Sequence, residues 1–339
     1  MISFHSTHKK IALAVLLASS LCFCSRPPKE IKRVKLLMGT KVEILAQGKD
    51  QAIMEAAVNK GFDEIERLEK KLSRFEPDSV VSRINQNAGQ SPVQVDSEVF
   101  GLIEKSVAVC KESNGAFEIT ILPVLSLWKY NDANPKPPSS QEVREKLNLV
   151  DCKKIILKKD QNLVFLPEPG MAIDLGGIAK GYAADKAAQK LRQNGVSAGI
   201  VNAGGNLTVF GGTGKGMAVG IQDPRKRGKI LAKIYITDGA ISTSGDYERF
   251  FIYNGVRYSH IIDPRTGYPA QGEESVTIFA ENGADADAWS TALFVLGSDQ
   301  GLKILAGKTG FSALFIDESG KIVSSPGLSQ RLVELKGEN

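Results

Sequence analysis

Apolar and polar positions recur along the chain with the periods that strands and helices produce. Residues 31–37 and 40–46 alternate as two strands do, with Gly39 between them. Helical spacing follows over 50–72 and over 96–113, where Gly115 favours a helix stop. The predicted inner faces consist of Ile53, Ala57, Phe62, Ile65, Leu68 and Leu72 in the first helix and of Leu102, Ile103, Ser106 and Cys110 in the second.

Helix-like and strand-like segments stay mixed through the rest of the chain. Three prolines within 131–140 predict a surface loop, and Ser139 with Glu142 forms a capping box that opens a short helix. Strands are predicted around 154–166, at 198–203, 206–210, 217–222, 231–237, 248–253 and 256–262, and around 311–323; helices are predicted at 178–194, 285–296 and 299–307. Because no steady βαβ rhythm emerges, the pattern favours an α+β fold over a doubly wound parallel sheet.

The first residues have the order of an export signal. Lys9 and Lys10 precede an apolar run that is too short to span a bilayer, and small residues follow it. The sequence then reaches Cys24, which lies three residues after Leu21 as the lipidated cysteine does in a bacterial lipobox. We therefore expect a lipoprotein signal peptide at 1–23, lipidation of Cys24, a tether at 24–30 and one domain over 31–335. An unlipidated secreted protein is the alternative.

Composition narrows the class of protein further. The 339 residues are 42% hydrophobic, enough for a substantial core. The formal charge of +5 falls to about +3 without Lys9 and Lys10, and charges of both signs are interspersed, which argues against a nucleic-acid partner. Cys110 and Cys152 remain in the mature chain without a zinc-binding or redox motif. Sequence leaves their pairing open, and a buried thiol is the simpler interpretation of Cys110.

Two glycine-rich segments have residues that are unusual for plain strands and helices. In 174–181 an acid, two glycines and then Lys180 lead into a helix, an arrangement that suits a phosphate at the helix N-terminus. A tight strand-to-helix turn capped by Asp174 is the alternative. The segment 202–206 is more typical of a hairpin turn, and 211–216 lacks the P-loop spacing and is interpreted as a hairpin loop.

Two further segments combine ionisable and hydroxyl side chains. His260 is the one histidine left after residues 1–23 are removed, and the turn at 263–267 follows it. Asp287 and Thr291 are four residues apart near a helix start, so a carboxylate and a hydroxyl share one face. Oxygen donors of this kind suit Mg²⁺, although acids near a helix start also stabilise the macrodipole.

Taken together and in this order, these segments resemble the ApbE family of FAD:protein FMN transferases. The matching stretches cover nearly the whole mature chain: Met38-Gly39-Thr40, Ala116-Phe117-Glu118 before Thr120, 174–181, 202–205, Ser244-Gly245-Asp246-Tyr247, 260–267 and 287–291. Each motif is weak alone, but seven in the right order are specific. The resemblance implies a single α+β domain of largely antiparallel strands with FAD in a cleft and Mg²⁺ at its diphosphate.

The resemblance also assigns roles to residues. Metal ligands would be the side chains of Asp287 and Thr291, with backbone oxygens near Gly177 and Ala284. Contacts to FAD would come from Met38, Phe75, Ala116, Phe117, Glu118, Asp174, Lys180 and Ile262, where Glu118 stands at a position that is often Asp in the family.

The expected reaction is attack by a Ser or Thr hydroxyl of a target protein on the FMN-side phosphorus of FAD, with AMP leaving. His260 is the candidate general base, and Asp287 could instead assist through the metal. A Mg²⁺-dependent FAD pyrophosphatase is the nearest alternative, followed by a flavin-binding lipoprotein without chemistry and an exported module with another ligand. For the transferase, the expected acceptor is an exported or membrane redox protein, and the lipid anchor would place the enzyme on a bacterial membrane facing the periplasm.

Overall fold

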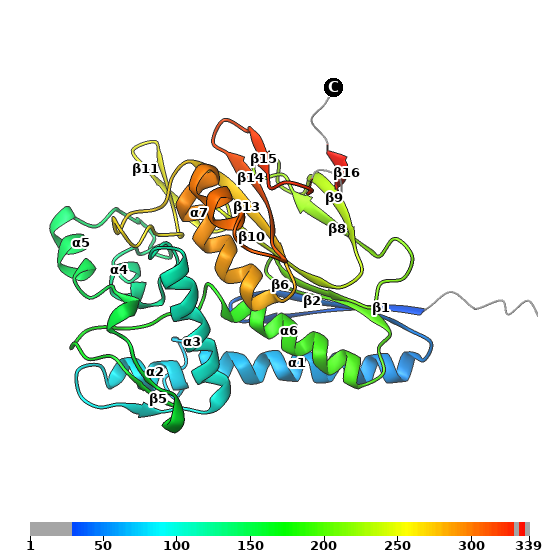
Figure 1. Cartoon of the computed structure of the whole chain (residues 1–339), viewed down its shortest axis with the longest axis horizontal. Helices are drawn as coiled ribbons and strands as arrows, with labels where there is room; N and C mark the ends of the chain where they lie inside the picture. Colours follow the sequence, from blue (N-terminus) through cyan, green and yellow to red (C-terminus); the bar gives the residue numbers. More distant parts are fainter. Residues whose placement is uncertain (1–28, 329–331, 336–339) are drawn as a thin grey trace, which may run out of the picture.

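The computed structural model describes residues 29–328 and 332–335. An eight-stranded sheet runs through the middle of the molecule (Figure 1). Its strand order is β1-β2-β6-β7-β10-β13-β14-β15, and every neighbouring pair is antiparallel. The strands are β1 (Lys29–Leu37), β2 (Thr40–Gly48), β6 (Ala198–Ala203), β7 (Asn206–Phe210), β10 (Gly239–Gly245), β13 (Glu273–Ala280), β14 (Ser312–Asp317) and β15 (Ile322–Ser324). The antiparallel sheet with its helices confirms the α+β prediction.

Three long helices cover one face of this sheet: α1 (Gln51–Leu72), α6 (Ala179–Gln193) and α7 (Gly283–Leu305) (Figure 1). The main core lies between them and the strands; on β13, Val276 and Ile278 belong to it. Within α7, Gly297 has a non-helical backbone with φ of 75°. The two helices predicted at 285–296 and 299–307 are therefore two segments of one kinked helix.

A small sheet packs on the opposite face. Its order is β16-β9-β8, with β8 (Met217–Gln222), β9 (Ile230–Ile236) and β16 (Leu332–Leu335). Phe279 of β13 and Ile241 of β10 point into this second core, opposite to their neighbours in sequence. The segment 211–216 leads from β7 in the large sheet to β8 in the small one. Its interpretation as a hairpin loop was wrong, because the strands that it joins do not pair.

The remaining elements form a lobe at one end of the large sheet (Figure 1). They are α2 (Val80–Gln86), α3 (Ser97–Glu112), α4 (Leu122–Leu125), α5 (Ser140–Leu147), the sheet β3 (Val93–Gln94), β5 (Leu163–Phe165) and β4 (Ile156–Lys158), the hairpin β11 (Phe250–Tyr253) and β12 (Val256–Ser259), and 3₁₀ turns at Ile119–Ile121, Cys152–Lys154 and Lys159–Gln161. Trp128 is at the centre of an aromatic cluster that joins α4 to the hairpin. The predicted capping box at Ser139 and Glu142 is present.

Local pattern identified most elements, and its failures have physical causes. The strands β10 and β13 were missed because both their faces are buried, so apolar and polar residues do not alternate along them. The short helix α2 was also missed. Ile53 was expected on the inner face of α1 but is 49% exposed, since the buried stripe runs through its neighbour Met54.

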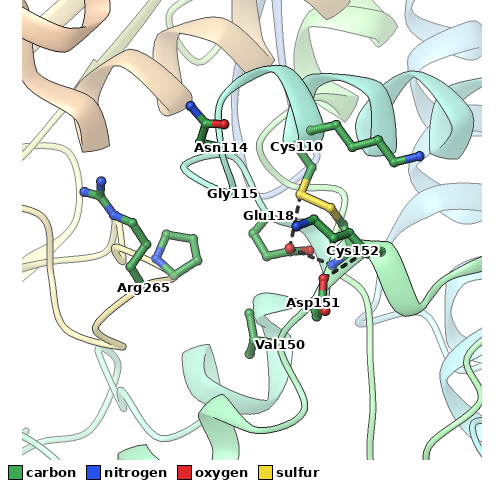
Figure 2. Close-up of a pocket in the computed structure, with 11 residues that line it drawn as sticks. Cys110, Asn114, Gly115, Glu118, Val150, Asp151, Cys152 and Arg265 are labelled. Carbon is green, nitrogen blue, oxygen red and sulfur yellow. Dashed lines mark hydrogen bonds between the residues drawn. A yellow bond between two sulfur atoms is a disulfide. The ribbon is translucent and has the colours of Figure 1, made fainter.

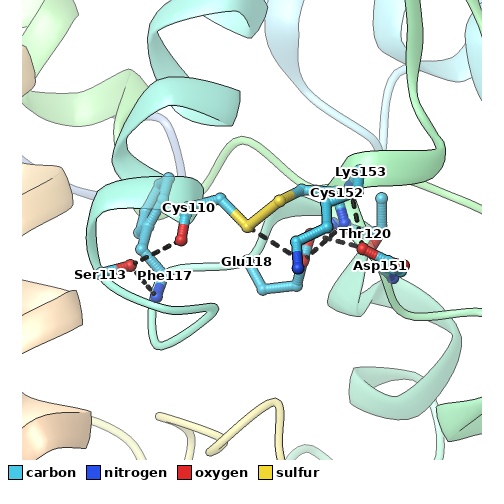
Figure 3. The surroundings of a disulfide bond; sticks show 8 residues. All are labelled: Cys110, Ser113, Phe117, Glu118, Thr120, Asp151, Cys152 and Lys153. Atoms are coloured by element: carbon cyan, nitrogen blue, oxygen red, sulfur yellow. Dashed lines mark hydrogen bonds between the residues drawn. A yellow bond between two sulfur atoms is a disulfide. The ribbon is translucent and has the colours of Figure 1, made fainter.

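Cys110 and Cys152 form a disulfide between the last turn of α3 and the 3₁₀ turn at Cys152–Lys154 (Figure 3). Cys110 is buried, as expected, but it is not a free thiol. The predicted signal peptide and Cys24 lie outside the described residues. Among the helices of the described part, none is long and apolar enough to cross a membrane.

Candidate active site

The first turns of α6 and α7 meet backbone to backbone. A Cβ atom on Gly181 would lie 2.0 Å from the carbonyl oxygen of Gly283, so this approach requires glycine. The amide of Gly181 donates a hydrogen bond of 3.0 Å to Oδ2 of Asp287 on α7. In the other direction, Asp185 on α6 accepts hydrogen bonds from the amides of Gly283 and Ala284 at 2.7 and 3.2 Å. These reciprocal bonds fix the start of α7 against α6.

The four predicted metal ligands lie around this junction. Asp287 and Thr291 are one helical turn apart on α7, and Ala284 is one turn before Asp287. Gly177 approaches from the segment before α6, since a Cβ on it would lie 3.5 Å from Oγ1 of Thr291. Asp287 is buried, and its Oδ2 accepts the hydrogen bond from the amide of Gly181. A buried carboxylate, a hydroxyl and backbone carbonyls are oxygen donors that fit a small divalent cation.

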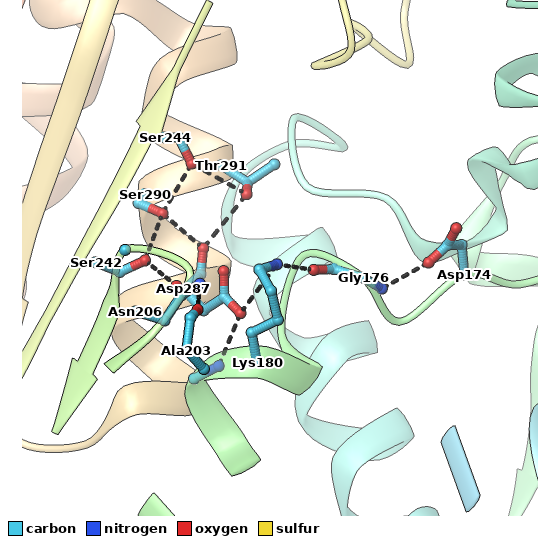
Figure 4. Close-up of polar contacts among 12 residues, drawn as sticks. Asp174, Gly176, Lys180, Ala203, Asn206, Ser242, Ser244, Asp287, Ser290 and Thr291 are labelled. Carbon is cyan, nitrogen blue, oxygen red and sulfur yellow. Dashed lines mark hydrogen bonds and ion pairs between the residues drawn. The ribbon is translucent and has the colours of Figure 1, made fainter. Parts of the chain in front are cut away.

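Lys180 supplies positive charge at the same place. Its Nζ lies 3.8 Å from Oδ2 of Asp287 and donates to the carbonyl oxygen of Gly176 (Figure 4). Burial raises the pKa of Asp287, and the ammonium of Lys180 opposes that shift. Lys180 therefore points back along the segment that precedes its helix. Anion binding by 174–181 stays a prediction.

His260 follows the hairpin β11–β12 and is partly buried. Its Nδ1 lies 3.2 Å from the carbonyl oxygen of Arg249, which can only accept, so Nδ1 carries the hydrogen and Nε2 keeps its lone pair. Burial, together with the nearby positive charge of Lys180, lowers the pKa of His260 to about 4. The imidazole is therefore neutral at pH 7, as a general base must be.

Asp174 and Phe75 are joined by a residue that the sequence did not single out. Nε of Arg74 lies 2.6 Å from Oδ2 of Asp174, and the guanidinium lies over the ring of Phe75 at 4.1 Å from its centroid. Phe75 is 72% exposed, which is unusual for a large aromatic side chain and leaves one ring face open for stacking. The signal for Arg74 was its place next to Phe75 in the sequence.

The segment 116–118 is built into the core beside the junction. Phe117 is buried, and a Cβ on Gly177 would lie 3.0 Å from its ring. The carboxyl group of Glu118 accepts hydrogen bonds from the amides of Thr120 at 2.9 Å and Cys152 at 2.8 Å, next to the disulfide (Figure 3). Burial raises the pKa of Glu118. Ala116 is buried as well, so contacts of this segment with FAD would use mainly its backbone.

The other two predicted FAD contacts differ in character. Met38 has φ of 53° and precedes Gly39 with φ of 67°, which makes the tight turn between β1 and β2. A left-handed conformation is rare for methionine, and the two-residue hairpin turn accounts for it here. Ile262 is buried in the aromatic cluster and forms an isolated bridge with Pro269.

A cavity of about 290 Å³ opens beside the segment 116–118 (Figure 2). It lies between the end of α3, the disulfide and the turn that follows His260. Its lining is mainly polar and comprises Cys110, Lys111, Asn114, Gly115, Glu118, Val150, Asp151, Cys152, Lys153, Pro264 and Arg265. Arg265 is held in place by an ion pair of 2.8 Å with Asp263. The predicted site therefore borders a solvent-accessible hollow on the Glu118 side.

A group of buried and half-buried hydroxyls beside Thr291 was not recognised as a unit in the sequence. Ser242 and Ser244 of β10 and Ser290 of α7 form a connected group with Asn206 of β7 (Figure 4). Only tertiary pairing of β10 with β7 and packing under α7 bring them together. The available signal was the run of small hydroxyl residues from Ser242 to Ser244.

Known proteins share this fold and are similar to this chain in sequence. The ApbE protein of Thermotoga maritima superimposes with a TM-score of 0.84 at 35% identity, covering 90% of this chain and all of that one. The flavin transferase ApbE of Vibrio cholerae superimposes with a TM-score of 0.78 at 26% identity, covering 90% and 100%. The fold is thus that of the ApbE proteins.

Sequence comparison gives the family. The profile of the ApbE family matches residues 38–315, and the chain belongs to this family. A Treponema pallidum protein named FAD:protein FMN transferase is 33% identical over 340 residues, which span 95% of this chain and 94% of the relative. A Klebsiella pneumoniae protein of the same name is 34% identical over 293 residues, spanning 86% and 90%.

Proposed function

We propose that this chain transfers the FMN moiety of FAD to a Ser or Thr hydroxyl of a target protein in a Mg²⁺-dependent reaction that releases AMP. Relatives that match almost the full chain carry the name of this activity. The observation that supports the mechanism is the α6–α7 junction, where Asp287, Thr291 and Lys180 meet. A buried acid, a hydroxyl and a lysine at a helix start suit a diphosphate with its cation.

The cation and the lysine have complementary tasks. Asp287 and Thr291, with the carbonyls of Gly177 and Ala284, would hold Mg²⁺, which supplies charge neutralisation at the diphosphate when bound. The side chain of Lys180 is long and flexible, so its ammonium could leave the carbonyl of Gly176 and bind a phosphate oxygen. Arg74 and the exposed ring of Phe75 offer a stacking surface beside Asp174.

His260 would accept the proton of the attacking hydroxyl. The hydroxyl oxygen forms a bond to the FMN-side phosphorus, the bond from this phosphorus to the bridging oxygen breaks, and AMP leaves with that oxygen. The proton moves to Nε2, the nitrogen whose lone pair the Arg249 contact leaves free. The imidazolium can then return the proton to solvent or to AMP.

Water in place of a protein hydroxyl would make the same site a pyrophosphatase. The residues around Asp287 and Lys180 act on FAD in both reactions, so the acceptor decides between them. We also propose that the acceptor is an exported or membrane redox protein, and that Cys24 anchors the enzyme to a bacterial membrane on the periplasmic side. The Cys110–Cys152 disulfide supports this location, because such bonds persist in oxidising compartments.

The test combines FAD, MgCl₂ and a candidate acceptor protein, and follows AMP, free FMN and the mass of the acceptor. A transferase adds an FMN phosphoester to the acceptor and fails with the matched acceptor whose Ser or Thr is replaced by Ala. Release of FMN and AMP at equal rates with and without acceptor would instead identify a pyrophosphatase.

The role of His260 has its own test. His260→Ala should lower the rate of transfer about 100-fold or more, within the range for loss of a general base, while FAD binding measured by flavin fluorescence persists. Arg249→Ala is the matched control for the hairpin, because its side chain is exposed while its backbone carbonyl still orients the histidine. Unchanged turnover in His260→Ala would remove the histidine from the mechanism.

A further inference from the structure

The hydroxyl of Thr291 belongs to a chain of contacting hydroxyl groups that runs from α7 to β7 (Figure 4). Those of Ser242 and Ser290 are buried. Oγ of Ser244 lies 3.4 Å from Oγ1 of Thr291 and 2.9 Å from Oγ of Ser290, which is 3.2 Å from Oγ of Ser242. Ser242 in turn contacts Asn206. Each hydroxyl has one hydrogen to give, so the group that receives it can be worked out from the ends of the chain. The contact between Ser242 and Ser290 receives no hydrogen, because both hydroxyls donate elsewhere.

The end at β7 fixes the hydrogen of Ser242. The Nδ2 group of Asn206 donates to the carbonyl oxygen of Ala203 at 3.1 Å, so its other atom, Oδ1, faces Ser242. An amide oxygen only accepts, and Ser242 must therefore donate to Asn206. The single hydrogen of Ser242 is used there and is not available to Ser290.

The end at α7 fixes the hydrogen of Ser290. Its Oγ lies 2.8 Å from the backbone carbonyl oxygen of Asp287, which only accepts, so Ser290 donates to it. Ser290 can then take part in the 2.9 Å contact with Ser244 only as acceptor. Ser244 consequently gives its one hydrogen to Ser290.

This direction leaves Thr291 free to bind a cation. Its own hydrogen goes to the carbonyl oxygen of Asp287 at 3.3 Å or to Ser244 at 3.4 Å. Ser244 has no second hydrogen to return. Both lone pairs of Oγ1 on Thr291 are therefore unused within the hydroxyl chain, and lone pairs are what a metal ligand must offer.

We propose that Ser290 is a positioning residue for the cation site: by accepting the hydrogen of Ser244, it keeps that hydrogen away from Thr291, where it would occupy one of the two lone pairs and repel the cation. The proposal rests on the Mg²⁺ site of the proposed function. Ser290 is fully buried and lies behind Thr291, so it acts through its neighbours, as outer-shell partners of metal ligands do. Without Ser290, the nearest side-chain acceptor for Ser244 is Thr291 itself.

The experiment measures binding of Mn²⁺ by electron paramagnetic resonance of the free ion, and of Mg²⁺ by the shift of thermal unfolding, in the full chain. Ser290→Ala should weaken both affinities about tenfold or more, in line with other outer-shell changes. The double variant Ser244→Ala/Ser290→Ala removes the hydrogen that turns onto Thr291 and should recover most of the affinity. Thr243→Val is the matched control, since this hydroxyl of β10 contacts Thr277 outside the chain.

The outcomes separate the possible failures. Recovery in the double variant supports the proposal, because lost packing would make the double variant at least as weak as Ser290→Ala. If Ser290→Ala binds the metal as tightly as the wild type does, the positioning role is overturned while the metal site stands. Absence of binding in the wild type, with Asp287→Ala as reference, overturns the metal site and the inference together.

Discussion

Replacing Gly181 by Ala tests whether the close approach of α6 to α7 builds the site. The added Cβ would lie 2.0 Å from the carbonyl oxygen of Gly283 and 2.8 Å from Cβ of Asp287. Such contacts are not tolerated below 3.0 Å, and the first obstacle is backbone, so the helices must separate by about 1 Å. The hydrogen bond from residue 181 to Asp287, now 3.0 Å, would lengthen with them.

The magnitude follows from two contributions. Overpacking of a core contact costs roughly 1–3 kcal/mol. Weakening a hydrogen bond to a buried carboxylate adds roughly 1.5–3 kcal/mol. We therefore expect Gly181→Ala to lower the free energy of unfolding by about 2.5–6 kcal/mol, with loss of AMP release under conditions where the variant is still folded.

Urea unfolding followed by circular dichroism and by tryptophan fluorescence measures this change. Gly101→Ala is the matched control, because Gly101 is an exposed glycine in α3 with no atom within 4 Å of the added Cβ. Alanine there should stabilise by roughly 0.5–1 kcal/mol through helix propensity alone. If Gly181→Ala instead matched the wild type within about 0.5 kcal/mol, the junction would be looser than the structure shows, and the argument for a rigid cation site would fail.

Two further predictions concern the disulfide and the histidine. The double variant Cys110→Ala/Cys152→Ala opens a loop of 42 residues and should lower the free energy of unfolding by up to about 4 kcal/mol, from the chain entropy that the unfolded state regains. Dithiothreitol should lower the urea midpoint of the wild type and leave that of the variant unchanged. Equal effects of dithiothreitol on both proteins would contradict this prediction. The pKa of His260 is lowered to about 4, and a general base works above its pKa. The acid limb of kcat/KM assigned to this residue should therefore lie near pH 4, and a limb near 6.5 that disappears in His260→Gln would refute the burial of the imidazole.

Regular periodicity made most of the fold predictable. The helices α1, α3 and α6 each bury one stripe and expose the rest, so their apolar positions recur at helical spacing and are visible without tertiary information. The turn Gly204-Gly205 was predicted from its paired glycines, and their φ values of 60° and 89° are ones that glycine reaches easily. The strands β10 and β13 lack such a signal, since neighbours bury them from both sides.

The sequence alone determined which chemical groups the chain offers and, through the order of its motifs, the family to which it belongs. Asp287 and Thr291 were recognisable as a pair because helix geometry places residues four apart on one face. Tertiary structure decided the rest: that Arg74 joins Phe75 to Asp174, that Asp185 holds the start of α7, and that Cys110 is bonded to Cys152. These partners come from segments separated by up to about 100 residues, and no local period records which distant side chain will complete a hydrogen bond once the core has packed.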